Sequence, residues 1–387
     1  MANSIDVLIA TLLVRGVKVL RETCLMPALV NKGYSNETKQ KGEVINVPVP
    51  KRKSTYSVSP SSTPKDPSDS TQEYATITLD QWQGADFVLT DQERTQIVKE
   101  DTFLPQQVDE AIRGLASDVN SNIFSKYVSV YGYTGTAGTT PFSNSTDRTA
   151  TKDATGLNKV LNDQLCPRGG RIALLDSSAE AEALALPQFA NLDKSGDIAV
   201  VRDANLGRKF GFNWFFDSEV PTHTAGVPGG TPVVTGANAA AVNDLSDSIT
   251  VSGMAASGTY LEGDIITIAG DTQTYVVTAD ATANGSGAAT LAIAPGLKVA
   301  TTGSEAITLK ADHVVNLGFN GNAFALVTAP FEKDDIGNAI VQSVRDPYTG
   351  LVLRLEVDRQ YKQTRWEFDI LWGAACVRPE LAARLAG

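Results

Sequence analysis

The chain has 387 residues, enough for about two or three compact domains, because a single hydrophobic core stops growing at roughly 250 to 300 residues. Its formal charge of −11 argues against tight sequence-independent binding to nucleic acid, which depends on Lys and Arg side chains that neutralise phosphates. The three cysteines, Cys24, Cys166 and Cys376, lack metal-ligand spacing, and an odd number fits a reducing compartment better than a disulfide framework.

The N-terminus carries the pattern of an amphipathic helix. Its apolar residues recur at helical spacing and charged residues interrupt them, which excludes the core of a secretory signal. The pattern predicts a helix that begins after Asn3 or Ser4, ends near Arg21 and stops before Pro27. Because no run of about 18 apolar residues occurs, the sequence also predicts a soluble, cytosolic product without a membrane span.

A long hairpin is predicted next. From Gly42 the apolar residues alternate as far as Val49, and a second extended run returns through Ile77 to Trp82. The tip of this hairpin, residues 51–73, carries charges of opposite sign on its two sides. Such a long segment buries almost nothing within its own subunit, so it is either a flexible loop or an arm that reaches a neighbouring subunit.

If the tip is an arm, its charged residues are the expected intersubunit contacts. These are Lys51, Arg52 and Lys53 on the outgoing side and Asp66, Asp69 and Glu73 on the returning side.

The strongest helical pattern begins near Pro105, a residue type favoured at the first helical position, and continues to about Tyr131. At the helical rise per residue this segment is about 40 Å long, so it can cross a whole domain as a spine. A predicted loop rich in Gly, Thr and Ser follows, from Gly132 to about Thr151.

The next segment alternates helices and strands, which is typical of an α/β layer. The predicted elements are a helix over 154–165 closed by Pro167, a strand over 171–175, a helix over 177–186 capped by serine, and an aromatic strand over 210–220. The apolar residues expected in its core are Ile172, Leu174, Leu184, Phe212 and Phe216.

A change in composition marks an inserted module, from about His223 to Asp312. No lysine or arginine occurs between Phe210 and Leu297, and the sequence becomes rich in Gly, Ala, Thr and Val. Short alternating runs separated by turn signals predict an all-β module. Its predicted strands are 248–251, 265–268, 274–278, 290–293 and 307–309.

The host fold resumes after the module with a predicted strand over 323–327. Alternating leucines predict a further strand from Leu351, and another follows over 366–372. The proline-containing turn 346–350 is predicted to separate these final strands. The segment 378–380 is predicted to end the fold.

The sequence contains no pattern that predicts catalytic, cofactor-binding or metal-binding residues. The only histidines, His223 and His313, flank the module, and no Gly-x-Ser-x-Gly or phosphate-loop motif accompanies them. Both are predicted to be structural or solvent-exposed. The acidic pairs 334–335 and Glu262/Asp264 lack the ligand spacing of a calcium loop and are predicted to lie in solvated turns.

An N-terminal arm, a long hairpin and a spine helix in this order are typical of subunits that interlock with copies of themselves. Several segments resemble the major capsid proteins of tailed bacteriophages, in particular the short-tailed branch, whose head fold is shared with herpesvirus capsids. These segments are Met1-Ala2-Asn3-Ser4-Ile5 with Val19-Leu20-Arg21-Glu22, residues 167–175, 210–213 and 218–226, and residues 263–270 within the module. The resemblance covers nearly the whole chain.

The resemblance implies an α+β capsid head fold with an inserted all-β module. The expected domains are an N-terminal arm (1–41), an extended hairpin loop (42–90), a peripheral domain with the spine helix (91–170), the first part of an axial domain (171–222), an inserted β-barrel-like domain (223–312), the second part of the axial domain (313–345), and C-terminal strands that return to the peripheral domain (346–387).

The resemblance also implies a non-enzymatic major capsid protein without cofactors, which assembles with a scaffolding protein into an icosahedral head around double-stranded DNA. The expected partners are other copies in hexamers and pentamers, a scaffolding protein, a portal protein and a cement or decoration protein. Contacts with packaged DNA are expected to be weak and non-specific, and no membrane is involved. The expected location is the virion, with assembly in the host cytoplasm. The alternatives are a tail tube or decoration protein, and a carbohydrate-active or carbohydrate-binding protein that uses the β module.

Overall fold

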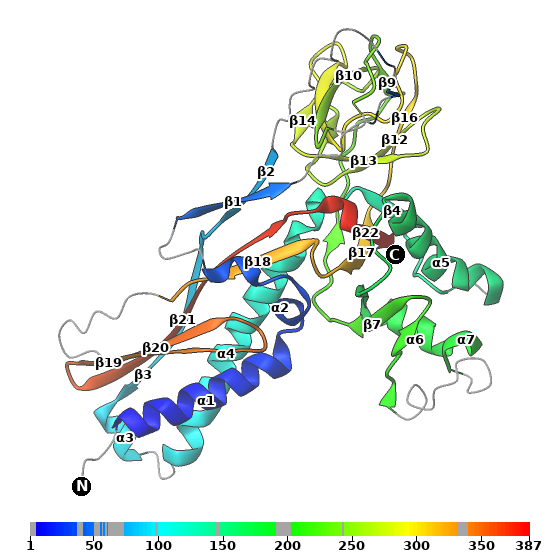
Figure 1. Ribbon diagram of the computed structural model, residues 1–387. Helices are drawn as coiled ribbons and strands as arrows, with labels where there is room; N and C mark the ends of the chain where they lie inside the picture. The colour runs from blue at the N-terminus through cyan, green and yellow to red at the C-terminus, as the bar shows by residue number, and fades with distance from the viewer. Residues whose placement is uncertain are drawn as a thin grey trace.

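The computed structural model describes residues 5–36, 42–49, 55, 57–58, 60, 73–96, 100–143, 147–190, 203–241, 244–330 and 340–387. Figure 1 shows an elongated molecule with long helices and strands at one end, a second sheet with helices in the middle, and a small β module at the other end. The C-terminus lies in the middle part, so the last strand is close to the base of the module.

A long helix, α4 (Glu100–Ser125), runs along the body and continues as the 3₁₀ helix η2 (Lys126–Ser129). Val108 and Ile112 on its apolar stripe are fully buried, so the predicted spine helix is confirmed. The helix begins at Glu100 and not near Pro105. The preference of proline for the first helical position is a statistical tendency, and here the helix begins five residues before Pro105.

Helix α1 (Ile5–Thr23) lies against α4 and the strands of the first sheet (Figure 1). Leu12 and Leu20 are buried in the main core, and the Arg15 guanidinium is 2.6 Å from the Asp109 carboxylate of α4. The described part of the predicted N-terminal arm therefore packs on its own subunit and does not protrude from it. The physical reason is that its apolar stripe needs cover, which α4 and the sheet supply.

The remaining helices are short. They are α2 (Met26–Leu29), η1 (Gly33–Asn36), α3 (Asp91–Gln96), α7 (Pro187–Ala190) and η3 (Pro379–Leu381). A search of the described residues for a helix with the length and apolar character of a membrane span finds none.

The first sheet is built on the longest strand, β21 (Gln363–Cys376). Strand β20 pairs with its first half and β18 with its last residues, while β3 pairs along its other side. The bounds of its partners are β3 (Gln81–Thr90), β18 (Phe324–Thr328), β19 (Ile340–Arg345) and β20 (Val352–Gln360). Trp82 thus belongs to β3, which pairs with β21, and not to the predicted hairpin. The turn 346–350 joins β19 to β20 and does not separate the strands over 351–355 and 366–372. Both predictions were wrong because pairing with distant residues decides which strands are neighbours.

Strands β1 (Val44–Val49) and β2 (Glu73–Thr78) form the base of the predicted hairpin, with Val44 opposite Thr78. Their inward residues form a separate apolar core with β18, β21 and neighbouring positions. This core contains Ile45, Val47, Val49, Ile77, Leu79, Ala325, Val327, Ala329, Leu371 and Val377. The hairpin base is therefore anchored to the first sheet through an apolar face.

The second sheet has the strand order β4-β22-β17-β5-β7-β6, and β8 pairs with the start of β17. Helix α5 (Asp147–Asp163) packs on β4 and β22, and α6 (Ser177–Ala185) packs on β5. The strand bounds are β4 (Gly132–Gly135), β5 (Arg171–Leu175), β6 (Arg208–Lys209), β7 (Phe212–Phe216), β8 (Thr222–His223), β17 (His313–Asn320) and β22 (Ala382–Ala386).

This sheet corrects several predictions. Residues 132–135, expected in a loop, form β4 beside the C-terminal strand β22, which continues the fold beyond the segment 378–380. The carboxylate of Asp176, and not a serine, caps α6 by accepting from two backbone N–H groups, as an N-cap aspartate commonly does. Phe216 is 41% exposed and lies outside the core, whereas the other predicted core residues are buried or packed against it.

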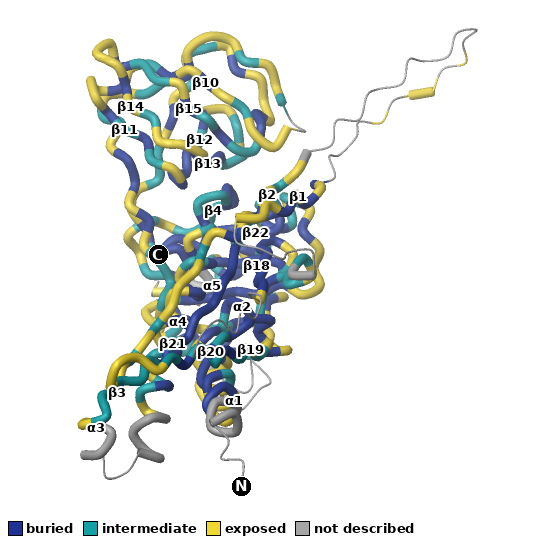
Figure 2. The backbone as a smooth tube through the Cα atoms, turned by 90° about the vertical axis from the view of Figure 1, so that its left-hand side faces the viewer, coloured by how far each residue is buried: buried dark blue, intermediate teal, exposed yellow. Residues whose placement is uncertain are grey.

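The module between β8 and β17 has an apolar core of its own. Its main sheet is antiparallel with the order β16-β12-β13-β15-β10-β9, and it contains each strand predicted for the module. The bounds are β9 (Val233–Val234), β10 (Asp247–Ser252), β11 (Thr259–Tyr260), β12 (Ile265–Ile268), β13 (Thr274–Val277), β14 (Ala281–Thr282), β15 (Ala289–Ala294) and β16 (Ile307–Leu309). Figure 2 shows buried positions along the centre of the body and again inside the module.

Candidate functional site

The charged residues predicted for intersubunit contact are not placed by the structure. Lys51, Arg52, Lys53, Asp66 and Asp69 lie outside the described residues, and Glu73 is the first residue of β2 with its side chain not described. The acidic pair 334–335 also lies outside them. The structure does place the base of the hairpin that carries the tip.

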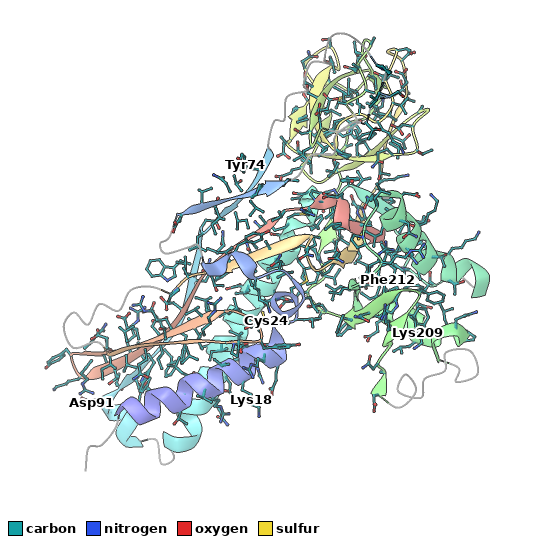
Figure 3. The ribbon with its side chains drawn as sticks, viewed as in Figure 1. Lys18, Cys24, Tyr74, Asp91, Lys209 and Phe212 are labelled. Carbon is teal, nitrogen blue, oxygen red and sulfur yellow. The ribbon has the colours of Figure 1, made fainter. Side chains whose placement is uncertain are left out.

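The outward face of the hairpin base is exposed and partly apolar. Val44 and Tyr74 are 50% and 54% exposed, and Figure 3 shows Tyr74 on the hairpin. A groove of about 600 Å³ lies between β2, the end of α4, β21 and the module residue Glu262. Apolar side chains exposed on such an element are available to pack against another protein surface.

A polar site lies beneath the module, where five elements meet: η2, β8, the turn before β12, β17 and β22. We call it the junction, and its residues are Tyr127, His223, Asp264, His313 and Arg384. Strands β8 and β17 place the two histidines directly opposite each other, with 5.3 Å between their ring centroids. Both histidines are buried, so the structural interpretation made from the sequence is confirmed over the solvent-exposed one.

His223 lies between two polar partners. The Tyr127 hydroxyl is 3.1 Å from its Nδ1, and Asp264 Oδ1 is 3.0 Å from its Nε2. The Asp264 carboxylate also accepts hydrogen bonds from the backbone N–H groups of Leu261 and Gly226. Asp264 is fully buried, so the predicted solvated turn is wrong for Asp264, whereas Glu262 is exposed as expected.

Arg384 joins the last strand to the end of the spine helix and to the module. Its guanidinium donates to the carbonyl oxygens of Gly263 (2.8 Å) and Tyr127 (2.9 Å), and it lies 4.9 Å from the centre of the Tyr127 ring. Burial lowers the pKa of Arg384 to about 10, so the group stays charged at neutral pH. Gly263 has φ of +91°, and a Cβ there would lie 3.2 Å from His223, so the close approach requires glycine.

His313 completes the junction as a neutral side chain. Its Nδ1 is 2.8 Å from the carbonyl oxygen of Ala311, which can only accept, so Nδ1 carries the proton. The Tyr133 ring packs edge-on against it at 5.4 Å. Burial lowers the pKa of His313 to about 4, which keeps the imidazole uncharged beside the buried Arg384 cation.

The junction is built to hold parts together. Its hydrogen bonds link β8, the module turn, η2 and β22, and each charged group is enclosed. Within the described ranges, no group of three or more His, Cys, Asp or Glu residues is placed to hold a metal ion. The arrangement fixes the position of the module relative to the spine helix and the second sheet.

Sequence reasoning singled out the two histidines and, separately, Asp264, but it did not bring them together and it missed Tyr127 and Arg384. Asp264 and Arg384 lie far from them along the chain and have no motif around them. The only signal in the sequence was the position of the two histidines, one at each end of the module. The two chain segments that connect an inserted module to its host must lie side by side.

The comparison with solved structures finds similar proteins, whereas the comparisons of the sequence find none. No family model matches the chain, and no curated protein matches it. A solved structure from Mycobacterium phage Che8 is similar over 93% of this chain and 90% of its own, with a TM-score of 0.50 and 14% identity. The capsid structure of cyanophage P-SCSP1u covers 92% and 85%, with a TM-score of 0.49 and 13% identity.

The mature capsid of bacteriophage PhiM1 gives a further match, with a TM-score of 0.48, 9% identity, and coverage of 93% of this chain and 86% of that chain. At such identities the similarity to the Che8 structure is one of fold. The predicted fold class is confirmed in these terms: the chain is α+β, and it shares its fold with a solved phage protein over nearly its whole length.

Proposed function

We propose that this chain is the major capsid protein of a tailed bacteriophage, a structural and non-enzymatic subunit of the virion. The observation that carries the proposal is the fold similarity to the Mycobacterium phage Che8 structure, which extends over 93% of the chain. The sequence segments that resemble tailed-phage capsid proteins support it independently, because they are spread from the first helix to the module.

The arrangement of parts suits a shell subunit. Helix α4 gives the body a rigid axis, and the base of the hairpin is anchored on the first sheet while its outward face stays exposed. A subunit of this kind can contact several neighbours at once without a large compact interface. We therefore propose that copies associate into hexamers and pentamers of an icosahedral head. We also propose the domain division expected from the sequence, except that β3 joins the first sheet and β4 and β22 join the second sheet.

The finer parts of the proposal concern other partners. Assembly would use a scaffolding protein, the head would carry a portal protein and accept a cement protein, and it would enclose double-stranded DNA. The formal charge of −11 fits a container that must hold dense DNA without binding it tightly. The charged residues of the hairpin tip would pair with a neighbour, where each exposed ion pair contributes about 0 to 1 kcal/mol and specificity comes from repetition over the lattice.

Expression of the full chain with its scaffolding protein, followed by electron microscopy, tests the proposal. Closed icosahedral shells are the expected product. Monomers or amorphous aggregate alone would reject it, and tubes or rings would favour the tail-tube alternative. Protease digestion tests the hairpin tip separately, because cleavage within residues 51–73 should be slower in shells than in the free subunit.

A further inference from the structure

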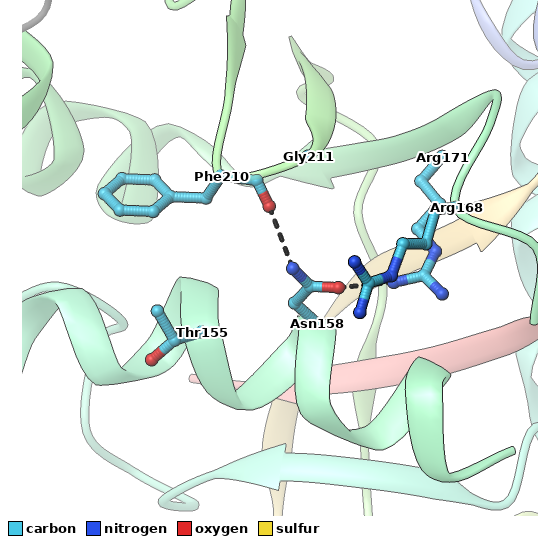
Figure 4. Close-up of a pocket in the computed structure, with 6 residues that line it drawn as sticks. All are labelled: Thr155, Asn158, Arg168, Arg171, Phe210 and Gly211. Atoms are coloured by element: carbon cyan, nitrogen blue, oxygen red, sulfur yellow. Dashed lines mark hydrogen bonds between the residues drawn. The ribbon is translucent and has the colours of Figure 1, made fainter.

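A pocket at the edge of the second sheet has an unusual charge. It has a volume of about 280 Å³ and is lined by Thr155, Asn158, Arg168, Arg171, Phe210 and Gly211 (Figure 4). Among the described residues, the lining contains two arginines and no acid. This is notable in a chain with 44 acidic and 33 basic residues, because a cationic pocket runs against the average charge of the surface.

Arg171 forms the inner wall of the pocket and is only 2% exposed. Its guanidinium donates to the carbonyl oxygens of Pro167 (2.9 Å) and Cys166 (2.6 Å) and to the side-chain oxygens of Asn162 (2.9 Å) and Asn158. All of these acceptors are neutral. The side chain is therefore held rigidly, but no described carboxylate pairs with its buried positive charge.

Arg168 adds a second positive charge at the rim. It is exposed, and among the described residues neither it nor Arg171 has an ion pair with a carboxylate. Figure 4 shows both arginines reaching the same side of the pocket, next to Asn158. Two guanidinium groups that converge without an acid among the described residues repel each other. The planar fork of Arg168 is suited to an oxyanion, whereas Arg171 uses most of its N–H groups in the hydrogen bonds above and contributes its positive charge.

The opposite wall is shaped by a strained turn. Phe210 and Gly211 join β6 to β7 with φ of +52° and +88°, although a bulky residue rarely adopts a positive φ. The Asn158 side chain holds this turn by donating to the carbonyl oxygen of Phe210 at 3.2 Å, while its oxygen accepts from Arg171. One amide thus positions both walls, so the pocket is preformed.

We infer that this pocket binds an oxyanion, and that in the assembled protein the oxyanion is a carboxylate side chain of a second copy of this chain. The choice of partner rests on the proposed function, because repeated copies present the same side chain at every pocket. It also rests on charge, because acidic residues exceed basic ones by the formal charge of −11. The same charge makes a DNA phosphate the weaker occupant.

The first test measures assembly. Arg168→Glu should lower the yield of shells at least about tenfold, because it places a like charge against the incoming carboxylate. The matched control is Arg208→Glu, the same charge change at an exposed arginine on β6 that does not line the pocket, which should change the yield by less than about twofold. Circular dichroism and the melting midpoint of both free subunits should equal those of the original chain. Normal shells from Arg168→Glu would overturn the inference.

The second test identifies the partner. Arg168→Lys places an amine in the pocket, and a carbodiimide then joins that amine to a carboxylate in direct contact by an amide bond. We expect a cross-link between two copies in shells, with mass spectrometry naming the acid. A link confined to one chain would overturn the inference, because it would place an acid of the same subunit in the pocket.

A third measurement separates the pocket from the proposed function. In the free subunit at constant ionic strength, inorganic phosphate should raise the melting midpoint of the original chain more than that of Arg168→Gln. An equal response in the two proteins would reject the oxyanion pocket. If the original chain forms no shells, the proposed function fails, and the phosphate measurement still decides whether the pocket binds an oxyanion.

Discussion

The hairpin base and the β module are attached to the body in different ways. The hairpin base lies on the first sheet through an apolar face formed by residues such as Val47, Ile77 and Val327. The module is joined at the junction, where buried polar groups such as Asp264 and Arg384 make specific hydrogen bonds. Apolar contacts are non-directional, whereas hydrogen bonds to buried charges define an orientation.

This difference has a consequence for assembly. Apolar contacts fix an orientation less strictly than hydrogen bonds do, so under the proposed function we expect the hairpin base to adjust to its neighbours in the shell. The junction cannot move without leaving buried polar groups unpaired, which costs about 1 to 3 kcal/mol for each group. We therefore expect the module to keep one orientation relative to the spine helix, and the predictions below test that contrast.

The largest effect is expected at Arg384. Arg384→Met keeps the length of the side chain but leaves the carbonyl oxygens of Gly263 and Tyr127 unpaired, so unfolding should become easier by about 4 kcal/mol. Urea unfolding of the free subunit measures this, and hydrogen exchange should rise in residues 261–265. The control is Arg365→Met, which removes partly exposed ion pairs with Asp86 and Glu367 and should change stability by less than about 1 kcal/mol. Equal effects would contradict the role of the junction.

A smaller loss is expected from Ile77 in the hairpin base. Ile77→Ala removes a side chain that is 1% exposed and should lower stability by about 3 kcal/mol, with Ile77→Val costing about 1 kcal/mol. Hydrogen exchange should increase in β1 and β2 and stay unchanged in the module. Faster exchange in both regions would show that the two attachments are coupled.

The junction should also make stability depend on pH. His313 has a pKa of about 4 when folded and about 6.5 when unfolded, so below pH 6.5 the unfolded chain binds a proton that the folded chain excludes. Stability contributed by the neutral imidazole is therefore present above pH 6.5 and is lost as pH falls towards 4. Between pH 7 and pH 5 the loss should be about 2 kcal/mol.

His313→Asn supplies the comparison, because an asparagine amide can still donate to the Ala311 carbonyl oxygen but does not titrate. Its stability should fall less than that of the original chain over the same pH range. The same pH dependence in both proteins would assign the effect to other groups, among which Arg384, His223 and Asp312 interact electrostatically with His313.

The smallest effect on the folded subunit is expected at Val44. Because its side chain is 50% exposed on the outward face of the hairpin base, Val44→Thr should change the free energy of unfolding by less than about 0.5 kcal/mol. If this face contacts a neighbour, the same variant should still weaken assembly, which light scattering of shell formation can measure. A large loss of subunit stability would show that Val44 is covered within its own chain.

Periodicity predicted the elements that bury one continuous face. The spine helix, the first helix and the strands of the module all carry such a pattern, and the structure contains each of them. Strand β22 was missed because it is buried on both faces within a sheet, so its residues show no alternation. Strand β4 was missed because it is only four residues long and two of them are glycines, which are typical of a loop. Trp82 was assigned to the wrong strand pair because strand partners depend on distant residues.

The sequence by itself determined the composition boundary of the module, the spine helix and the histidines at the two ends of the module. Only the tertiary structure decided that these histidines meet, that Asp264 and Arg384 join them, and that Arg168 and Arg171 converge in one pocket. The physical reason is that periodicity records which face of a local element is buried. Contacts between charged groups far apart in the chain are created by the way those faces stack, which no local pattern encodes.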